Sequence, residues 1–342
     1  MDVLIVEALD PQALQWLAAR HPTRFEPRLE RDPRALRQAL GPARALIAPP
    51  AVALDAALLA AAPQLRAVGR MSGGVENLDV EALAAAGVEI VRAAVASAAA
   101  EAEFAVAATL QLLRRVPVHA PDGALVGREL GGCTVGLVGL PPAARPLAAM
   151  LQVFGARIVG YDPARHASDR LWAELQVEAV GLRELIRGSD VVCVLLGYFS
   201  RYRGLIGERY LLECKPGQVM VSLAHSQLFD ELALADALRS GRLHAAWFDG
   251  LEPGLRDPQQ PLHAVPGLHV TQGLASTTLQ ARTRSAWTVV RRIDEILAMA
   301  RAEPPPAEAL PAEPQREPAL PPADAEPAAV ADLPEGRVHP GA

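Results

Sequence analysis

The sequence predicts an α/β protein made of two parallel-sheet domains and a C-terminal tail. Short apolar runs rich in Val, Ile and Leu alternate with Ala- and Leu-rich segments of helical period as far as Arg301. After Arg301 the composition changes abruptly, and Pro, Ala and acidic residues dominate. A length of 342 residues is sufficient for two domains of ordinary size.

The apolar runs are the expected strands. They are residues 3–6, 45–48, 88–91, 135–138, 157–161, 191–196, 219–223 and 268–271. Their alternation with helices predicts parallel sheets, because parallel neighbours need a crossover connection. Two helices are expected to begin at Asp10-Pro11 and Asp32-Pro33, since an acid caps a helix and Pro fits its first turn. Residues 100–115 predict one long helix between the two domains.

Residues 303–342 predict a disordered tail. The segment contains no aromatic residue, Ile or Met, so it cannot bury enough apolar surface to offset the entropy of ordering. Its prolines leave two interpretations open, a segment that binds a partner and a solvated extension. We expect the solvated extension.

The charge balance excludes some classes of function. The chain has 33 Lys and Arg against 39 Asp and Glu, a net charge of -6. Counterion release onto basic side chains drives non-specific nucleic-acid binding, so we expect no nucleic-acid partner. The N-terminus lacks a signal-peptide pattern, and no apolar stretch reaches about 18 residues. A cytoplasmic protein without a membrane partner is expected. The histidines have no metal-site spacing, so no metal is expected.

Residues 135–162 have the layout of a dinucleotide-binding β-α-β unit. A buried strand leads into a turn at Gly139, a helix follows over 143–154, and a second strand ends at Asp162. An acid at this position is typical of a ligand to the ribose of NAD. The predicted cofactor contacts in this unit are Gly139, Leu140, Ala144 and Asp162.

The turn departs from the G-x-G-x-x-G fingerprint. Pro141 stands where the second Gly lets bare backbone approach the pyrophosphate, and Pro142 follows it. Each Pro removes an N–H donor, and a hydrogen bond to a charged group is worth about 1.5–3 kcal/mol. We therefore predict NAD as the cofactor with an affinity lowered by about 10²–10⁴. A Rossmann scaffold that is kept only for packing is the alternative.

Motifs on both sides of this unit resemble the D-isomer-specific 2-hydroxyacid dehydrogenases. Residues 70–79, R-M-S-G-G-V-E-N-L-D, resemble the family's G-x-G-V-D-N-x-D segment. Further matches, in the family's order, are S-D-V-V at 189–192, G-L-I-G at 204–207, K-P-G at 215–217, D-E at 230–231 and S-G-R-L at 240–243. The resemblance covers nearly all of residues 1–302.

The resemblance implies the domain organisation. A flavodoxin-like, substrate-side domain is expected over residues 1–99, completed by 278–302. A dinucleotide-binding Rossmann domain is expected over 100–277. A homodimer that forms through the Rossmann domains is also expected.

The resemblance also implies catalytic roles. In this family an Arg binds the substrate carboxylate, and a His paired with a Glu moves the hydroxyl proton while hydride passes to the nicotinamide. The V-N-x-x-R-G-G segment corresponds to residues 221–227, which places His225 at the Arg position. The T-P-H-x-x-G-x-T segment corresponds to 271–278, which places Gly273 at the His position. Gly273 has no proton to transfer.

Glu252 is the candidate for the family's Glu. The L-D-V-F-x-x-E-P segment matches residues 248–253, but Glu252 precedes the ungapped position, so a solvated loop Glu is the alternative. Asp249 of the same segment is assigned to the cofactor. Gly73, Gly74 and Arg92, which replaces a usual Asn, are assigned to the substrate.

Two functions follow from these substitutions. The first is a pseudo-enzyme or metabolite-sensing module with weak or absent standard hydride transfer. The second is an active NAD-dependent oxidoreductase in which His225 acts as acid and base, with Arg92 or Arg70 as the cation. A small 2-hydroxy or 2-oxo acid is the expected ligand. We predict the first function.

Overall fold

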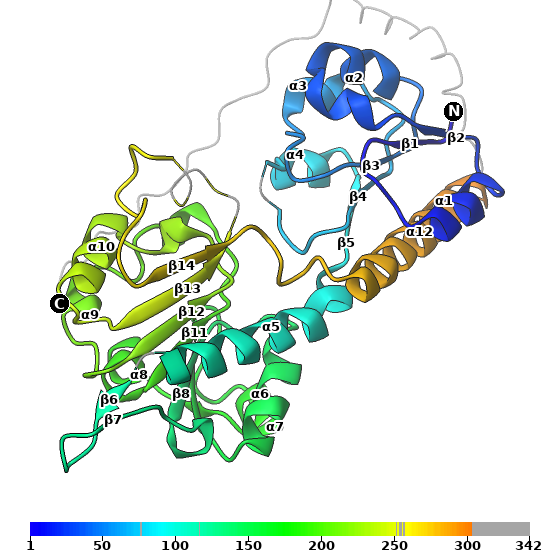
Figure 1. Ribbon diagram of the computed structural model, residues 1–342. Helices are drawn as coiled ribbons and strands as arrows, with labels where there is room; N and C mark the ends of the chain where they lie inside the picture. Colours follow the sequence, from blue (N-terminus) through cyan, green and yellow to red (C-terminus); the bar gives the residue numbers. More distant parts are fainter. Residues whose placement is uncertain (76, 116, 251, 253–254, 256, 303–342) are drawn as a thin grey trace, which may run out of the picture. The chain divides into compact units, whose positions relative to one another are not determined.

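The computed structural model contains two parallel sheets (Figure 1). It describes residues 1–302 apart from 76, 116, 251, 253, 254 and 256. Met1–Arg301 forms one compact unit that contains five- and seven-stranded sheets, so the predicted fold class is confirmed. The predicted tail, 303–342, lies outside the described residues. No helix of the described part is both long and apolar enough to cross a membrane.

The first sheet has the strand order β2-β1-β3-β4-β5, with every pair parallel. In that order the strands are Thr23–Phe25, Val3–Ile5, Ala45–Ile47, Ala67–Arg70 and Glu89–Arg92. The connecting helices are α1 (Pro11–Ala18), α2 (Pro33–Leu40), α3 (Ala56–Ala60) and α4 (Val80–Ala85). Two helix starts were predicted and are confirmed, because the carboxylates of Asp10 and Asp32 accept backbone N–H groups of the first turns.

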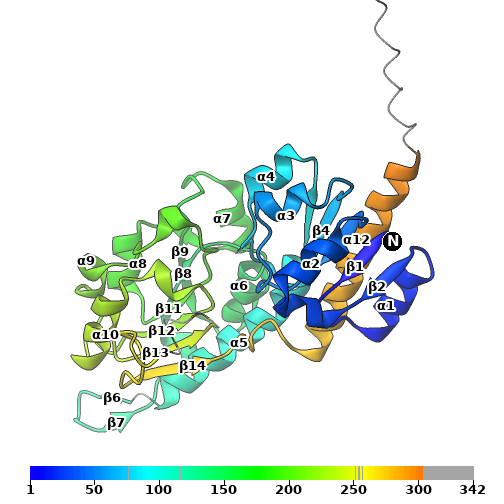
Figure 2. The ribbon, with the colours of Figure 1, turned by 90° about the horizontal axis from the view of Figure 1, so that it is seen from above.

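A helix from the far end of the chain completes this sheet. α12 (Leu279–Ala302) lies beside α1 (Figure 1, Figure 2). Its Val289 and Ile293 share a core with Ile5 and Ile47. Gly69 of β4 permits this packing, since a Cβ there would lie 2.5 Å from Cγ1 of Val289.

The long helix α5 begins earlier than expected. It covers Ala94–Arg115, whereas the sequence predicted a start at residue 100. The first turns are almost all Ala and Val, so their pattern does not mark a boundary. Ala96 packs into the core with α12, while Leu112 and Leu113 pack into the core of the second sheet. One helix therefore contributes to both cores.

The second sheet has the strand order β10-β9-β8-β11-β12-β13-β14, also parallel throughout. In that order the strands are Glu178–Ala179, Arg157–Tyr161, Thr134–Val138, Val191–Val194, Val219–Ser222, Ala245–Asp249 and Leu268–Thr271. The helices between them are α6 (Ala144–Val153), α7 (Arg170–Leu175), α8 (Leu182–Gly188), α9 (Glu208–Leu211) and α10 (Glu231–Arg239). An antiparallel hairpin, β6 (Val118–His119) and β7 (Leu125–Val126), precedes it.

The strand order reverses direction at β8. From β8 the chain first adds β9 and β10 on one side and later adds β11 to β14 on the other. Ligands of open parallel sheets bind at the carboxyl ends of the strands where this reversal occurs. The loops after β8, β9, β11 and β12 are therefore the place to look for a site.

Candidate functional site

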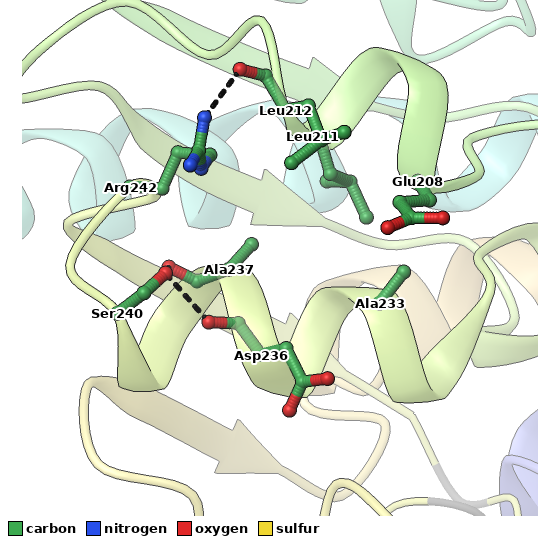
Figure 3. Close-up of a pocket in the computed structure, with 8 residues that line it drawn as sticks. All are labelled: Glu208, Leu211, Leu212, Ala233, Asp236, Ala237, Ser240 and Arg242. Atoms are coloured by element: carbon green, nitrogen blue, oxygen red, sulfur yellow. Dashed lines mark hydrogen bonds between the residues drawn. The ribbon is translucent and has the colours of Figure 1, made fainter.

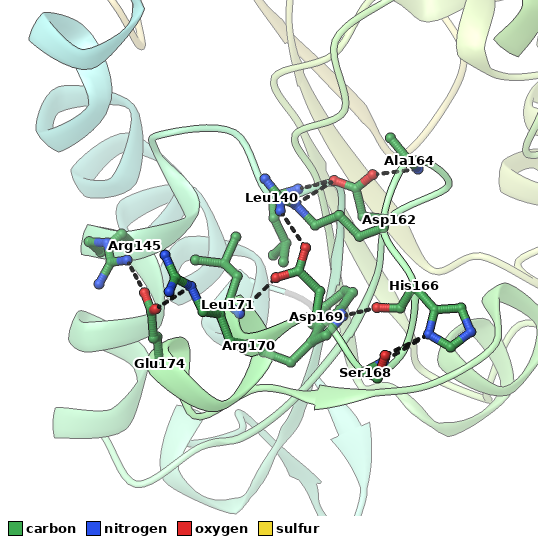
Figure 4. A network of polar contacts seen from close by, with 12 residues as sticks. Leu140, Arg145, Asp162, Ala164, His166, Ser168, Asp169, Arg170, Leu171 and Glu174 are labelled. Carbon is green, nitrogen blue, oxygen red and sulfur yellow. Dashed lines mark hydrogen bonds and ion pairs between the residues drawn. The ribbon is translucent and has the colours of Figure 1, made fainter.

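The loop after β8 is fastened to the loop after β9 (Figure 4). The N–H of Gly139 donates to the carbonyl of Tyr161 at 2.7 Å, and the N–H of Leu140 donates to Oδ2 of Asp162 at 2.9 Å. Oδ1 of Asp162 accepts the N–H of Ala164 at 2.9 Å. The structure thus brings Gly139, Leu140 and Asp162 together, and Asp162 joins two loops with its own carboxylate.

This turn offers few N–H donors to a phosphate. Pro141 and Pro142 have none, and Pro146, the third residue of α6, has none either. The N–H of Ala144 already donates to the carbonyl of Pro141 at 2.9 Å. Sequence reasoning missed Pro146, although a Pro in a first helical turn is a readable signal. The remaining N–H groups between Pro141 and Pro146 are those of Ala143 and Arg145.

Arginines near this turn are paired with carboxylates (Figure 4). Arg165 lies with Nε 4.0 Å from Oδ2 of Asp162 and with Nη1 2.8 Å from Oδ2 of Asp169. The pKa of Asp169 is held below its usual value by the N–H of Leu171 and by Arg165. In related folds an acid at this position bonds the ribose 2′-hydroxyl of NAD, whereas a nearby Arg accommodates the 2′-phosphate of NADP.

His225 follows β12 and starts the short 3-10 helix Ser226–Leu228. Its Nδ1 accepts the N–H of Gln227 at 3.2 Å, and its ring stacks on Tyr198 with the ring centroids 4.7 Å apart. The hydroxyl of Tyr198 donates to Oε1 of Gln227 at 2.9 Å. Because Nδ1 uses its lone pair on an amide, the neutral ring carries its proton on Nε2. His225 therefore presents a hydrogen-bond donor at Nε2.

Glu252 lies beside this histidine. Its Oε1 accepts the N–H of Ser226 at 2.6 Å, while the hydroxyl of Ser226 donates to Glu231. Gly250 permits this position, because a Cβ there would collide with the Glu252 carboxylate. Glu252 is thus linked to His225 through the backbone N–H of Ser226, the residue that follows His225. The described contacts include no direct hydrogen bond between the side chains of Glu252 and His225.

Asp249 ends β13 and holds the loop that follows β14. Its Oδ1 accepts the N–H of Leu274 at 2.9 Å, and its Oδ2 accepts the N–H of Ala275 at 2.8 Å. Just before these two residues, Gly273 has a φ of 69°, which favours glycine. Asp249, predicted as a cofactor contact, therefore holds the loop after β14 in place through these two hydrogen bonds.

Glu101 of α5 is an acid that sequence reasoning missed. Burial raises the pKa of its carboxyl, and the charge of Asp249 raises it further, while a hydrogen bond from Ser97 lowers it. The hydroxyl of Ser97 donates to Oε1 of Glu101 at 2.7 Å. Glu101 and Glu103 are the two acids in the Ala-rich run of α5, and their presence there was the available signal.

The predicted substrate residues lie on the five-stranded sheet. Nη1 of Arg92, at the end of β5, donates to the carbonyl of Gly73 at 3.2 Å. Gly73 faces α5 closely, because a Cβ there would lie 3.0 Å from Cβ of Ala94. Gly74 follows on the same loop. These residues and the pair of His225 and Glu252 therefore come from different sheets.

A small hollow between α9 and α10 is separate from these residues (Figure 3). It has a volume of about 180 Å³ and is lined by Glu208, Leu211, Leu212, Ala233, Asp236, Ala237, Ser240 and Arg242. Arg242 donates from Nη1 to the carbonyl of Leu212 at 2.8 Å. None of the predicted site residues lines it. Across the described residues, His, Cys, Asp and Glu form no group of three that could hold a metal ion.

Comparisons with known proteins place the chain in a family. The family model described as "D-isomer specific 2-hydroxyacid dehydrogenase, NAD binding domain" matches residues 104–274. The D-3-phosphoglycerate dehydrogenase of Mycobacterium tuberculosis is 34% identical over 308 residues, which cover 86% of this chain and 57% of that protein. The (S)-sulfolactate dehydrogenase of Chromohalobacter salexigens is 31% identical over 306 residues, which cover 87% of this chain and 99% of that protein.

The solved structures agree with the sequence matches. The TT0316 protein from Thermus thermophilus has a TM-score of 0.73 and 26% identity, covering 87% of this chain and 97% of that one. The chain spans 57% of the length of the Mycobacterium tuberculosis phosphoglycerate dehydrogenase that it matches. The matched NAD-binding domain gives no support to the expected weakening of NAD binding. The chain belongs to the D-isomer specific 2-hydroxyacid dehydrogenase family.

Proposed function

We propose that this chain binds a small 2-hydroxy or 2-oxo acid without the family's standard hydride transfer, as a pseudo-enzyme or metabolite-sensing module. The observation that carries the proposal is the hydrogen bonding of His225, which stands at the position of the family's Arg. Its Nδ1 accepts the N–H of Gln227, so the neutral ring offers one donor. A single imidazole N–H does not reproduce the two parallel hydrogen bonds that a guanidinium gives to a carboxylate.

Gly273 supports the same proposal. The family's proton-transfer His corresponds to this position, which here has no side chain. General acid–base catalysis accelerates a reaction by a factor of about 10²–10⁴. Because Nδ1 of His225 already accepts the N–H of Gln227, this ring is poorly suited to take over the proton transfer of the family's His. Removal of both groups is therefore expected to leave little standard turnover.

The direct test mixes the full chain with NADH and a panel of 2-oxo acids. The expected result is no loss of NADH absorbance above the rate without protein. Thermal-shift titration with each acid alone is run in parallel, because a ligand that binds the native state raises the midpoint. Turnover of any acid would contradict the loss of hydride transfer, and the absence of any shift would contradict the ligand class.

An active oxidoreductase is the second candidate. Glu252 favours it, because this acid bonds the N–H of Ser226 directly beside His225. If turnover is observed, the variant His225→Ala tests whether His225 carries it, with His244→Ala at an exposed histidine as the control. Loss of turnover in the first variant alone would establish the second candidate.

For the cofactor we propose weak NAD(P) binding, caused by the prolines of the turn after β8. The double variant Pro141→Gly and Pro142→Ser gives the turn two more N–H donors, so we expect its NADH affinity to rise at least about tenfold. Titration of NADH fluorescence measures this, with Pro258→Ala in an exposed turn as the control. Equal affinity of the double variant and the unchanged chain would contradict the proposal.

A further inference from the structure

Asp162 and Asp169 belong to one network of polar contacts after β9, and Arg165 links them (Figure 4). Nη1 of Arg165 lies 2.8 Å from Oδ2 of Asp169, and its Nε lies 4.0 Å from Oδ2 of Asp162. The hydrogen-bonded partner is therefore Asp169, while Asp162 lies only within ion-pair distance. Arg165 is exposed, so a ligand bound beside this loop can reach its guanidinium.

The loop that carries Arg165 is fixed at several points. The buried Trp172 donates from Nε1 to the carbonyl of His166 at 3.0 Å, and the N–H of Asp169 donates to the same carbonyl at 3.0 Å. The N–H of Arg165 donates to the carbonyl of Asp162 at 3.1 Å. The backbone of the loop thus holds Arg165 beside both acids.

Asp169 makes two separate contacts with its two oxygens. It is the N-cap of α7, since its Oδ1 accepts the N–H of Leu171 at 2.9 Å, while its Oδ2 faces Arg165. The Leu171 N–H and Arg165 hold the pKa of the Asp169 carboxyl below its ordinary value, so this acid is ionised at neutral pH. An Asn here keeps an oxygen for the cap but removes the charge that pairs with Arg165.

Asp162 still has acceptor capacity for the ribose of a dinucleotide. A carboxylate has about four lone-pair sites, and the N–H groups of Leu140 and Ala164 each use one of them. In related folds an acid at this position bonds the ribose 2′-hydroxyl, whereas a nearby Arg accommodates a 2′-phosphate. This chain has both residues, so the cofactor that it prefers depends on whether Arg165 is free to bind a phosphate.

The charges of the network do not favour an additional phosphate. Its ion pairs join three arginines and three carboxylates, which are Arg145, Arg165, Arg170, Asp162, Asp169 and Glu174. Glu174 pairs with Arg145 and Arg170, which leaves Arg165 with the two aspartates. A phosphate with a charge of about −1.5 to −2 at pH 7 meets one positive and two negative charges there. A neutral 2′-hydroxyl meets no such repulsion.

We propose that Asp169 sets the choice of cofactor: it holds Arg165 and thereby makes the chain bind NAD(H) in preference to NADP(H). Asp169 acts through Arg165 and is therefore a positioning residue, which does not itself need to touch the cofactor. The inference rests on the proposed binding of NAD(P), and it is independent of whether hydride transfer occurs.

The test compares the affinities of the full chain for NADH and NADPH, which differ by one phosphate. Fluorescence titration at one low salt concentration measures both, because salt screens exposed charges. Asp169→Asn is expected to raise the affinity for NADPH relative to NADH about tenfold, since Arg165 gains one charge-assisted hydrogen bond to the phosphate. The affinity for NADH itself should change less than about twofold. The prolines after β8 affect both cofactors alike, so their effect cancels in the ratio.

A double-mutant cycle tests whether Arg165 carries the effect. Arg165→Gln alone is expected to lower the affinity for NADPH, because the two aspartates then face the phosphate without a cation. In the Arg165→Gln background, the gain from Asp169→Asn should fall from about tenfold to about threefold or less. An equal gain with and without Arg165 would contradict the proposed role of Asp169.

Two control variants separate this role from general effects of charge and capping. Asp32→Asn changes a cap on the other sheet, where Asp32 accepts the N–H of Ala35, and should alter neither affinity. Glu174→Gln removes a carboxylate from the same network but leaves Arg165 paired with Asp169, so its effect on the ratio should stay under about threefold. Equal effects of Glu174→Gln and Asp169→Asn would show that net charge alone sets the preference.

The outcomes separate this inference from the proposed function. Tighter binding of NADPH than of NADH by the unchanged chain, or an unchanged ratio in Asp169→Asn, would overturn the inference. Turnover of NADH with a 2-oxo acid would overturn only the proposed loss of hydride transfer. The titrations are repeated in the Pro141→Gly and Pro142→Ser background, whose turn has two more N–H donors. Failure of both cofactors to bind there as well would overturn the proposed cofactor and the inference together.

Discussion

The variant Gly139→Ala is expected to lose about 2–4 kcal/mol of unfolding free energy. Gly139 has a φ of 90°, and a Cβ there would lie 2.6 Å from Cα of Leu196 and 2.7 Å from its N. The backbone of Leu196, two residues after the end of strand β11, cannot rotate away as a flexible side chain can. The backbone strain of an alanine at this φ adds to the steric overlap. Both destabilise the turn after β8, whose Leu140 N–H donates to Asp162. Urea unfolding followed by Trp fluorescence measures the loss.

Gly87→Ala is the matched control for this prediction. Gly87 has a φ of 67°, and nothing lies within 4 Å of a Cβ built on it. Only the strain of the left-handed conformation should appear there, about 1 kcal/mol. Equal losses in the two variants would show that the contact with Leu196 contributes nothing.

Asp249→Ala is the second large effect that we expect, a loss of about 2–4 kcal/mol. Asp249 is 9% exposed, and its carboxylate accepts the N–H groups of both Leu274 and Ala275. Removal leaves the buried Ala275 N–H without its partner. Relief of the repulsion with Glu101 offsets part of the cost. The same urea unfolding experiment measures the loss.

Two further variants test the cause. Asp122→Ala removes a carboxylate that accepts one exposed N–H, from Ala124, and should cost under about 1 kcal/mol. Asp249→Asn keeps one acceptor and removes the charge. The pKa of Glu101, followed by NMR, should then move toward its ordinary value. An unchanged Glu101 pKa would contradict the proximity of the two acids.

Features set by neighbouring residues were predictable from the sequence. The caps at Asp10 and Asp32 depend on residues within one helical turn, and the structure confirms both. Strand β9 was also predicted correctly, because its apolar run is continuous in the chain and Asp162 follows its last residue. Each of these signals lies within a few residues of the feature it predicts.

Features that depend on distant segments were not predictable. The proton position on His225 follows from the turn at Gln227, which Tyr198 holds from another loop. The Glu7 carboxylate accepts the backbone N–H of Met71, a contact that depends on register across an intervening strand. Strand β13, Ala245–Asp249, was missed because its apolar run Ala-Ala-Trp-Phe contains none of the Val, Ile or Leu residues that marked the other strands.

The place of α12 in the chain has a consequence for synthesis on the ribosome. β5 ends at Arg92, but α12, which covers the apolar residues Ile5 and Ile47, begins only at Leu279. The seven-stranded sheet is encoded between them and can fold as one continuous stretch. Until α12 is synthesised, the apolar face of the five-stranded sheet stays exposed. Exposed apolar surface of this kind binds chaperones or aggregates. A circular permutant that translates α12 first should remove that delay.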